Sequence, residues 1–166
     1  MPNALPRITS QEFQKLAPGA NAALGSLGQA VAASGLEGEL LQLIKLRASQ
    51  LNGCAFCTQL HLNESRHMGI AAAKLDLLVV WREAGIYSER EKAAFAWTEL
   101  LTRLAVSHIT DDDYAAVSAQ FPPAELAWLS TSIALINVWN RLAAPFQYAP
   151  PVPRHEIHAA HEPVNA

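Results

Sequence analysis

The fold is decided by the segment LLQLIKLRASQLNGCAFCTQLH, which runs from Leu40 to His61. In its first half, leucine and isoleucine recur at positions that cover more than half of a helix circumference, so a largely buried helix is predicted over about 37–51. Asn52 and Gly53 both tolerate turn geometry and end that helix. A second helix is predicted over about 54–69, where a glycine closes it. Both cysteines of the chain therefore fall at the start of the second helix.

Helical patterns dominate the rest of the chain, and no run of residues alternates between apolar and polar as a strand does. We expect an all-α fold, a compact multi-helix domain over residues 1–166 that ends in a Pro-rich tail over 145–166. A short helix that Ser10 caps is predicted to end before Pro18, and another is predicted over 71–84. A third follows the capping box formed by Ser88 and Glu91, and a fourth begins with the acidic residues Asp111–Asp113. The last is predicted over 124–144. The Ala- and Gly-rich residues 20–34 fit either a closely packed helix or a loop.

The composition indicates how the protein assembles, which partners it lacks and where it is located. Half of the residues are hydrophobic and 16% are charged, an apolar surplus that favours a homo-oligomer. The net charge of −3 gives no electrostatic reason to expect nucleic acid or an anionic membrane as a partner, and no apolar run is long enough to span a bilayer. The start, MPNALPRITSQEF, lacks the pattern of a secretory signal, so we expect a cytoplasmic protein. That compartment disfavours a static disulfide, so a close cysteine pair indicates redox chemistry or metal binding.

The cysteine pair has a histidine one helical turn away. Because helical residues advance by about 100° each, Cys54, Cys57 and His61 share a stripe roughly 60° wide. The free N–H groups and the dipole at a helix start favour a thiolate, and a nearby imidazole can accept the thiol proton. Cys57, the nearer to His61, is expected to attack a peroxide oxygen and become a sulfenic acid. Cys54 would then condense with it to a disulfide, which an outside dithiol reduces.

Two plainer interpretations stand beside this one. Buried free cysteines are common core residues. A structural zinc site usually needs four ligands, whereas Cys54, Cys57 and His61 supply three. His67 is a possible fourth ligand, but it lies on the opposite side of the helix and fits better as a surface residue near the helix C-terminus.

The same segment, Leu40 to His61, resembles the core motif of the carboxymuconolactone decarboxylase superfamily, in its alkylhydroperoxidase D-like (AhpD-like) branch. Two downstream stretches, YSEREKAAFAWTELLT and FPPAELAWLSTSIALINVWNRLA, resemble the segments that follow the motif in that branch. The likeness covers roughly residues 37–143, which form the motif-bearing core. It implies an all-α AhpD-like fold and a homo-oligomer, either a trimer or a hexamer built from dimers.

The resemblance also implies an activity. It implies reduction of a hydroperoxide by peroxidatic Cys57, resolving Cys54 and proton-relay His61, with electrons from a dihydrolipoamide-type dithiol or another thiol carrier protein. No metal, haem or flavin is expected as a cofactor. Two rivals remain: a lyase that decarboxylates a muconolactone, which does not need a CxxC pair, and a non-enzymatic redox sensor, which would oxidise once per subunit.

Two positions depart from the family pattern. The relay glutamate twelve residues before the first cysteine is replaced by Gln42, which cannot take a proton at neutral pH. Glu39 and Glu64 are possible substitutes, although we favour ordinary helix-surface roles for both. The best-known peroxidase of the family has a histidine between its cysteines, whereas this chain has Ala55 and Phe56, and Phe56 is expected to pack in the core.

Other polar and aromatic residues have plainer interpretations. His155, His158 and His161 could bind a metal, but their place after a Pro-rich run favours adventitious binding or disorder. The four tryptophans are expected in the core or in an interface. Three polar residues within the apolar last helix need partners if they are buried, either in a neighbouring subunit or in the pocket: Asn137, Asn140 and Arg141.

Overall fold

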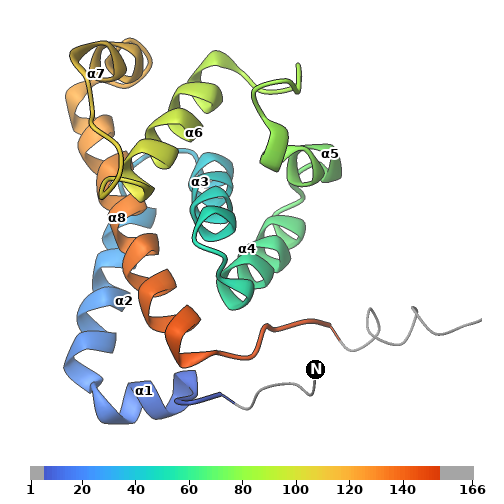
Figure 1. Ribbon diagram of the computed structural model, residues 1–166, viewed down its shortest axis with the longest axis vertical. Helices are drawn as coiled ribbons and strands as arrows, with labels where there is room; N and C mark the ends of the chain where they lie inside the picture. The colour runs from blue at the N-terminus through green and yellow to red at the C-terminus, as the bar shows by residue number, and fades with distance from the viewer. Residues whose placement is uncertain (1–5, 154–166) are drawn as a thin grey trace, which may run out of the picture.

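Helix α3 (Gly38–Leu51) lies at the centre of the molecule in the computed structural model, which describes residues 6–153 (Figure 1). It packs against α4 (Ala55–His67), α6 (Glu89–Thr102) and α8 (Pro123–Phe146). Its leucine and isoleucine side chains are buried on more than one face, as the sequence predicted. Over residues 6–153 all regular structure is helical, which confirms the all-α fold.

Shorter elements surround this centre: α1 (Ser10–Leu16), α2 (Pro18–Ala32), α5 (Ala72–Asp76), the 3₁₀ helix η1 (Leu78–Val80) and α7 (Asp111–Ser118). Figure 1 shows α2 beside α8 along one side of the molecule, with α1 across their lower end. None of the helices between residues 6 and 153 is long and apolar enough to cross a membrane.

Two predicted boundaries were wrong. The side chain of Thr9, not Ser10, caps α1 and forms a capping box with Glu12. The predicted helix over 71–84 is instead split into α5 and η1. The Tyr87 hydroxyl donates to the carbonyl oxygen of Lys74 at 2.6 Å and so ties the segment after η1 back to α5.

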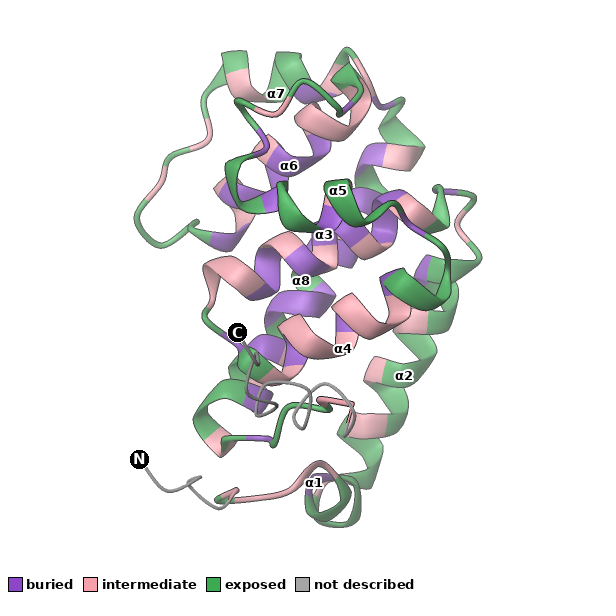
Figure 2. Cartoon of the chain, turned by 90° about the vertical axis from the view of Figure 1, so that its right-hand side faces the viewer, coloured by how far each residue is buried: buried purple, intermediate pink, exposed green. Residues whose placement is uncertain are grey.

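Helix α2 resolves the ambiguity over residues 20–34 in favour of a helix, although not a closely packed one. Figure 2 shows it mostly exposed, in contrast to the buried α3, and among its residues only Val31 is buried. Its exposed face is rich in alanine and glycine. The homo-oligomer expected from the composition remains a prediction.

The apolar interior forms two clusters. The larger one fills the space between α3, α6, α8 and the α5–η1 segment. The smaller one surrounds the cysteines with side chains from α1, α3, α4, α8 and the residues after α8: Phe13, Ala48, Cys54, Cys57, Ile136, Ala143 and Tyr148. The cysteines therefore lie in their own apolar compartment, away from the main core.

A buried carboxylate ties three elements of the larger core together. Glu99 of α6 accepts hydrogen bonds from Arg47 of α3 at 2.6 and 2.8 Å and from the Trp81 indole at 2.9 Å. Arg82 pairs with its second oxygen at 2.8 Å. Burial by itself raises the pKa of Glu99, but the donors from Trp81, Arg47 and Arg82 outweigh it, and the pKa is lowered.

Candidate functional site

A tight turn places the first cysteine at the N-terminus of α4. Asn52 caps the end of α3, and Gly53 follows with a φ of 63°, a left-handed conformation that favours glycine. Cys54 is then the N-cap of α4, and its sulfur accepts the backbone N–H of Cys57 at 3.3 Å. The Asn52-Gly53 break and the start of the second helix at the cysteines are confirmed.

The two sulfurs face one another. Both cysteines are reduced and buried, and their sulfur atoms lie 2.7 Å apart in a hydrogen bond. This hydrogen bond, helped by the backbone N–H groups of Cys57 and Phe56, overcomes burial and lowers the pKa of Cys54 to about 7. The contact with Cys54, together with burial, raises the pKa of Cys57. Of the two thiols, Cys54 therefore has the lowered pKa.

The cavity gives a ligand access to the sulfur of Cys57 rather than to that of Cys54. A cavity of about 400 Å³ opens beside α4, and Cys57 is among its lining residues. Cys54 is not, within the part of the chain that the structure describes. A ligand in this cavity thus meets Cys57, whose sulfur lies 2.7 Å from that of Cys54.

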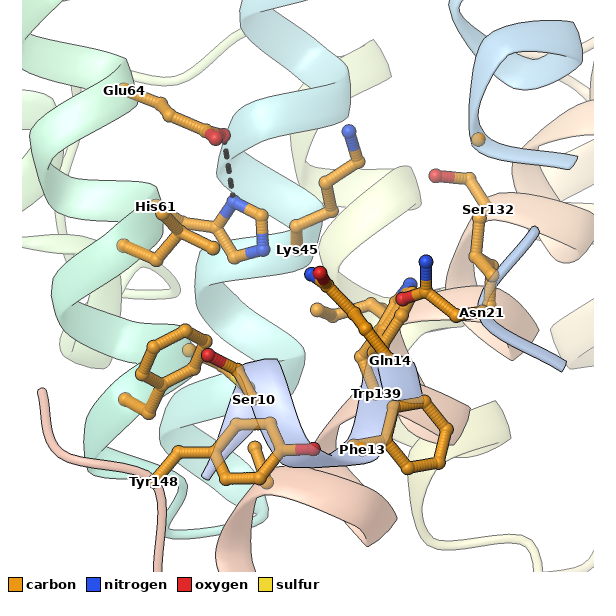
Figure 3. A pocket seen from close by; sticks show the side chains of 17 residues that line it. Ser10, Phe13, Gln14, Asn21, Lys45, His61, Glu64, Ser132, Trp139 and Tyr148 are labelled. Atoms are coloured by element: carbon orange, nitrogen blue, oxygen red, sulfur yellow. Dashed lines mark hydrogen bonds and ion pairs between the residues drawn. The ribbon is translucent and has the colours of Figure 1, made fainter. Parts of the chain in front are cut away.

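His61 lines the same cavity and is held by two oxygens. Its Nδ1 lies 3.0 Å from Oε1 of Gln42 and 3.2 Å from Oε2 of Glu64. Because both neighbours are acceptors, the proton is assigned to Nδ1, which leaves Nε2 as the acceptor. Figure 3 shows that second ring nitrogen turned towards the cavity, away from Glu64.

The two glutamates considered as substitutes for the missing relay residue differ. The expectation of a mere surface role is wrong for Glu64, whose contact with His61 chiefly lowers the pKa of its carboxyl. Glu39 instead accepts a hydrogen bond from Lys74 at 2.6 Å, and His61 makes its contacts with Gln42 and Glu64. His67 is exposed near the end of α4, as predicted.

A buried amide network supports the cysteine pair from α8. The Asn52 side chain donates to Oδ1 of Asn140 at 2.8 Å and to Oδ1 of Asn137 at 3.0 Å. Asn140 in turn donates to the Ser49 hydroxyl at 3.2 Å, and its amide also bonds to the sulfurs, which favours their anions. The polar residues of the last helix therefore find partners within the chain, and Arg141 joins them through Asn137.

Aromatic side chains cover the site. As expected, Phe56 packs against the core, in the smaller apolar cluster; it also lines the cavity, where its ring meets that of Tyr148 edge-on at 5.4 Å. Tyr148 follows α8, in the stretch that was predicted to be a tail, and is buried. The sequence analysis did not single it out, although a tyrosine in a Pro-rich stretch was an available signal. The tail histidines 155, 158 and 161 lie outside the described residues.

The cavity is mixed in character (Figure 3). Aliphatic and aromatic side chains from α1, α4 and α8 form most of its wall, and a few polar groups project into it. The polar lining residues are Ser10, Gln14, Asn21, Lys45, His61, Glu64 and Ser132.

Comparison with known proteins identifies the family. The model of the carboxymuconolactone decarboxylase family matches residues 18–100, half of the chain. The chain belongs to the carboxymuconolactone decarboxylase family. A family relative of unknown role, YdfG of Bacillus subtilis (strain 168), is 36% identical over 102 residues, which span 61% of this chain and 69% of YdfG.

Solved structures agree with the fold of this family member. A protein of unknown function from Agrobacterium tumefaciens, suggested to be the antioxidant defence protein AhpD, is 39% identical with a TM-score of 0.84. The alignment covers 90% of this chain and all of that one. A peroxidase-related protein from Silicibacter sp. TM1040 shares the fold at 18% identity and a TM-score of 0.70, over 79% of this chain and 70% of the other.

The family-matched segment and the cavity wall overlap only in part. Gln42, both cysteines and His61 fall within residues 18–100. Phe13, Trp139 and Tyr148 also line the cavity and lie outside it. In this carboxymuconolactone decarboxylase family member, the reactive groups and much of the pocket wall therefore come from different parts of the sequence.

Proposed function

We propose that the protein is a thiol peroxidase that reduces organic hydroperoxides with its CxxC pair. The observation that carries this proposal is the position of Cys57, which lines a largely apolar cavity beside His61 while its sulfur touches that of Cys54. A nucleophile, a base and a second thiol are the groups that a two-cysteine peroxidase needs. The suggested AhpD role of the Agrobacterium tumefaciens relative supports the same activity.

The first step uses the charge distribution of the pair. As a hydroperoxide ROOH approaches Cys57, the thiol proton of Cys57 passes to the Cys54 thiolate at 2.7 Å or to Nε2 of His61. The Cys57 thiolate attacks the terminal peroxide oxygen, the O–O bond breaks, and RO⁻ leaves with the electron pair. A proton converts RO⁻ to the alcohol ROH, and Cys57 becomes a sulfenic acid.

The second step closes the disulfide. The Cys54 sulfur attacks the sulfenic sulfur of Cys57, hydroxide leaves and takes a proton, and the products are a disulfide and water. The sum is one dithiol and one ROOH giving one disulfide, ROH and water. An external dithiol such as dihydrolipoamide, free or carried on a lipoyl protein, then reduces the disulfide by exchange. The cycle needs no bound cofactor or metal.

Counting thiols tests the assignment. Reduced protein is mixed with cumene hydroperoxide, and free thiols are followed beside Cys57→Ser and Cys54→Ser. We expect rapid loss of both thiols in the natural sequence, no rapid loss in Cys57→Ser, and a trapped sulfenic acid in Cys54→Ser. Thiols that react no faster than free cysteine would refute peroxidase activity, and a sulfenic acid in Cys57→Ser would exchange the two roles.

His61 is tested against a matched histidine on the same helix. His61→Gln removes the proton acceptor, and general acid–base catalysis contributes about 100-fold or more. His67→Gln alters an exposed histidine two turns nearer the helix end and is expected to react at the natural rate. Equal rates in the two variants would remove His61 from the mechanism.

Turnover separates the enzyme from its rivals. With dihydrolipoamide present, an enzyme consumes many equivalents of hydroperoxide per subunit, whereas a redox sensor oxidises once and stops. A lyase would convert 4-carboxymuconolactone at a rate that survives the Cys54→Ser and Cys57→Ser changes. We expect repeated hydroperoxide turnover and no conversion of the lactone.

A further inference from the structure

Lys45 is a cation with no partner at the edge of the cavity. It projects from α3, lines the cavity with His61, and is half-buried. Among residues 6–153 no carboxylate lies within salt-bridge distance of its ammonium. Burial lowers the pKa of Lys45, and the charge of Glu64, which acts at longer range, only partly offsets the effect. A half-buried ammonium without a hydrogen-bond acceptor from the protein is partly desolvated, so the site favours an anion brought by a ligand.

Two hydroxyl groups in the same cavity also lack partners. The Ser132 hydroxyl is fully buried and makes no hydrogen bond within the described part of the chain. The same holds for the hydroxyl of Tyr148. Buried polar atoms are nearly always hydrogen-bonded, so two such atoms in one cavity indicate a polar ligand. Figure 3 shows the Ser132 hydroxyl turned towards the ammonium end of Lys45.

The two polar positions lie on either side of apolar walls. Between them the cavity is lined by the side chains of Phe13, Leu60, Leu135, Ile136 and Trp139. Tyr148 stands at the cysteine end, since it belongs to the same apolar cluster as Cys57 and packs edge-on against Phe56; burial raises its pKa, so its hydroxyl keeps its proton. The cavity thus offers a proton donor near the reactive sulfur, an apolar middle, and a cationic end with a hydroxyl.

Glu64 is the one acidic group among the lining residues and does not cancel this cation. Its carboxylate is held by His61 at 3.2 Å and is also bonded by Gln42, which turns it towards the imidazole. Its side chain is 44% exposed, so solvent screens its charge. The hydrogen bonds of Lys45 remain available to a ligand.

We propose that the cavity selects organic hydroperoxides that carry a carboxylate, with Lys45 and Ser132 binding the carboxylate and Tyr148 donating to the peroxide group beside Cys57. The inference deepens the proposed peroxidase function and rests on it. Lys45 is then a specificity residue: it acts on substrate binding and leaves the chemistry at sulfur to the cysteines and His61.

A matched pair of substrates tests the selection. The probes are 4-(2-hydroperoxypropan-2-yl)benzoate and its methyl ester, which differ only in the charge at the far end. In the natural sequence we expect kcat/KM for the acid to exceed that for the ester by about 10-fold or more, the contribution of one charge-assisted hydrogen bond. The difference is expected in KM, since the carboxylate is remote from the reacting oxygen.

Variants assign the preference to Lys45. In Lys45→Met the ratio of acid to ester is expected to fall to about one, and Lys45→Arg should restore most of it. The control Lys92→Met removes a lysine of α6 that pairs with Glu89 and should keep the natural ratio. Because each variant is compared with itself on two substrates, a general loss of stability cancels. A natural ratio near one, or a ratio that survives in Lys45→Met, would overturn the inference.

Binding of the unreactive alcohols separates this inference from the peroxidase proposal. Calorimetry with 4-(2-hydroxypropan-2-yl)benzoate and its methyl ester needs no redox chemistry. We expect the acid to bind about 10-fold more tightly than the ester, and Lys45→Met to remove the difference. If neither hydroperoxide is turned over but this difference is found, the anion site stands and the peroxidase proposal fails. Equal affinities would refute the anion site alone.

Discussion

Gln42 lies 3.0 Å from Nδ1 of His61, although the two residues belong to different helices. The amide oxygen accepts the Nδ1 proton together with Glu64 and so selects the tautomer in which Nε2 is free to accept. A glutamine can orient the ring but cannot take its proton. The acidic partner of the imidazole is Glu64, 3.2 Å from Nδ1 and on the same helix as the histidine.

Gln42→Leu should therefore slow the thiol reaction and Gln42→Glu should not. Loss of one acceptor costs the oriented imidazole about 1.4 kcal/mol, so the rate of thiol loss with cumene hydroperoxide is expected to fall about 10-fold in Gln42→Leu. Gln42→Glu keeps an acceptor at the same place and should react at least as fast as the natural sequence. If both variants react alike, the contact with His61 does not serve the reaction.

The Cys54 thiolate should appear as the pH rises through about 7. Absorbance at 240 nm reports thiolates, and the low-pH step should vanish in Cys54→Ser. Cys57→Ala removes the largest cause of the lowered pKa, so the step should move towards the ordinary range of a thiol near 8.5. Cys57→Ser keeps a donor and should leave the step closer to neutral. A low-pH step that persists in Cys54→Ser would place the charge on Cys57.

Gly53→Ala and Gly25→Ala should change stability in opposite directions. Neither added Cβ meets an atom within 4 Å, so only the backbone conformation differs between the sites. At Gly53, with φ at 63°, alanine is strained by roughly 1–2 kcal/mol. Gly25 lies within α2, where alanine stabilises a helix by roughly 0.5–1 kcal/mol. Urea denaturation measures both, and two changes of the same sign would contradict the assigned turn.

Glu99 should make the fold sensitive to acid. Its pKa is lower in the folded chain than in the unfolded chain, so its contribution is complete above the unfolded value and is lost as the pH falls through the folded value. We expect the free energy of unfolding to decrease below about pH 5, the acidic window in which carboxylates lose their charge. Glu99→Gln should flatten that decrease and cost about 3 kcal/mol at neutral pH, because Arg47 stays buried without its counter-ion. Glu89→Gln, at an exposed position, is the control and should change neither quantity measurably.

The helices whose signals lie in nearby residues were predicted correctly from the sequence. Periodicity placed α3 and α4, and the Ser88–Glu91 capping box placed α6, because these signals lie within a few residues of the elements that they control. The helix predicted over 71–84 was wrong, since this segment forms α5 and η1 and is tied together by the tertiary contact between Tyr87 and Lys74.

The site followed the same rule. The spacing of Cys54, Cys57 and His61 correctly predicted that they share one stripe of α4. The contact between Glu64 and the imidazole was considered, but an ordinary surface role was preferred for Glu64. Tyr148 could not be placed, because its burial against Phe56 depends on how the chain returns after α8. Nor could spacing show that Cys54 has the lowered pKa of the pair, since that depends on the contact between the two sulfurs.

The division of the cavity between the family-matched segment and the flanking helices has an evolutionary consequence. The sulfurs, the imidazole and Lys45 belong to residues 18–100, whereas Phe13, Ser132 and Tyr148 reach the same cavity from outside it. Mutations in the flanks can reshape what the cavity admits without moving the reactive atoms. Paralogues that share the central helices are therefore free to diverge in substrate. Exchanging the flanking segments between two such proteins is a direct way to transfer the substrate preference of one to the other.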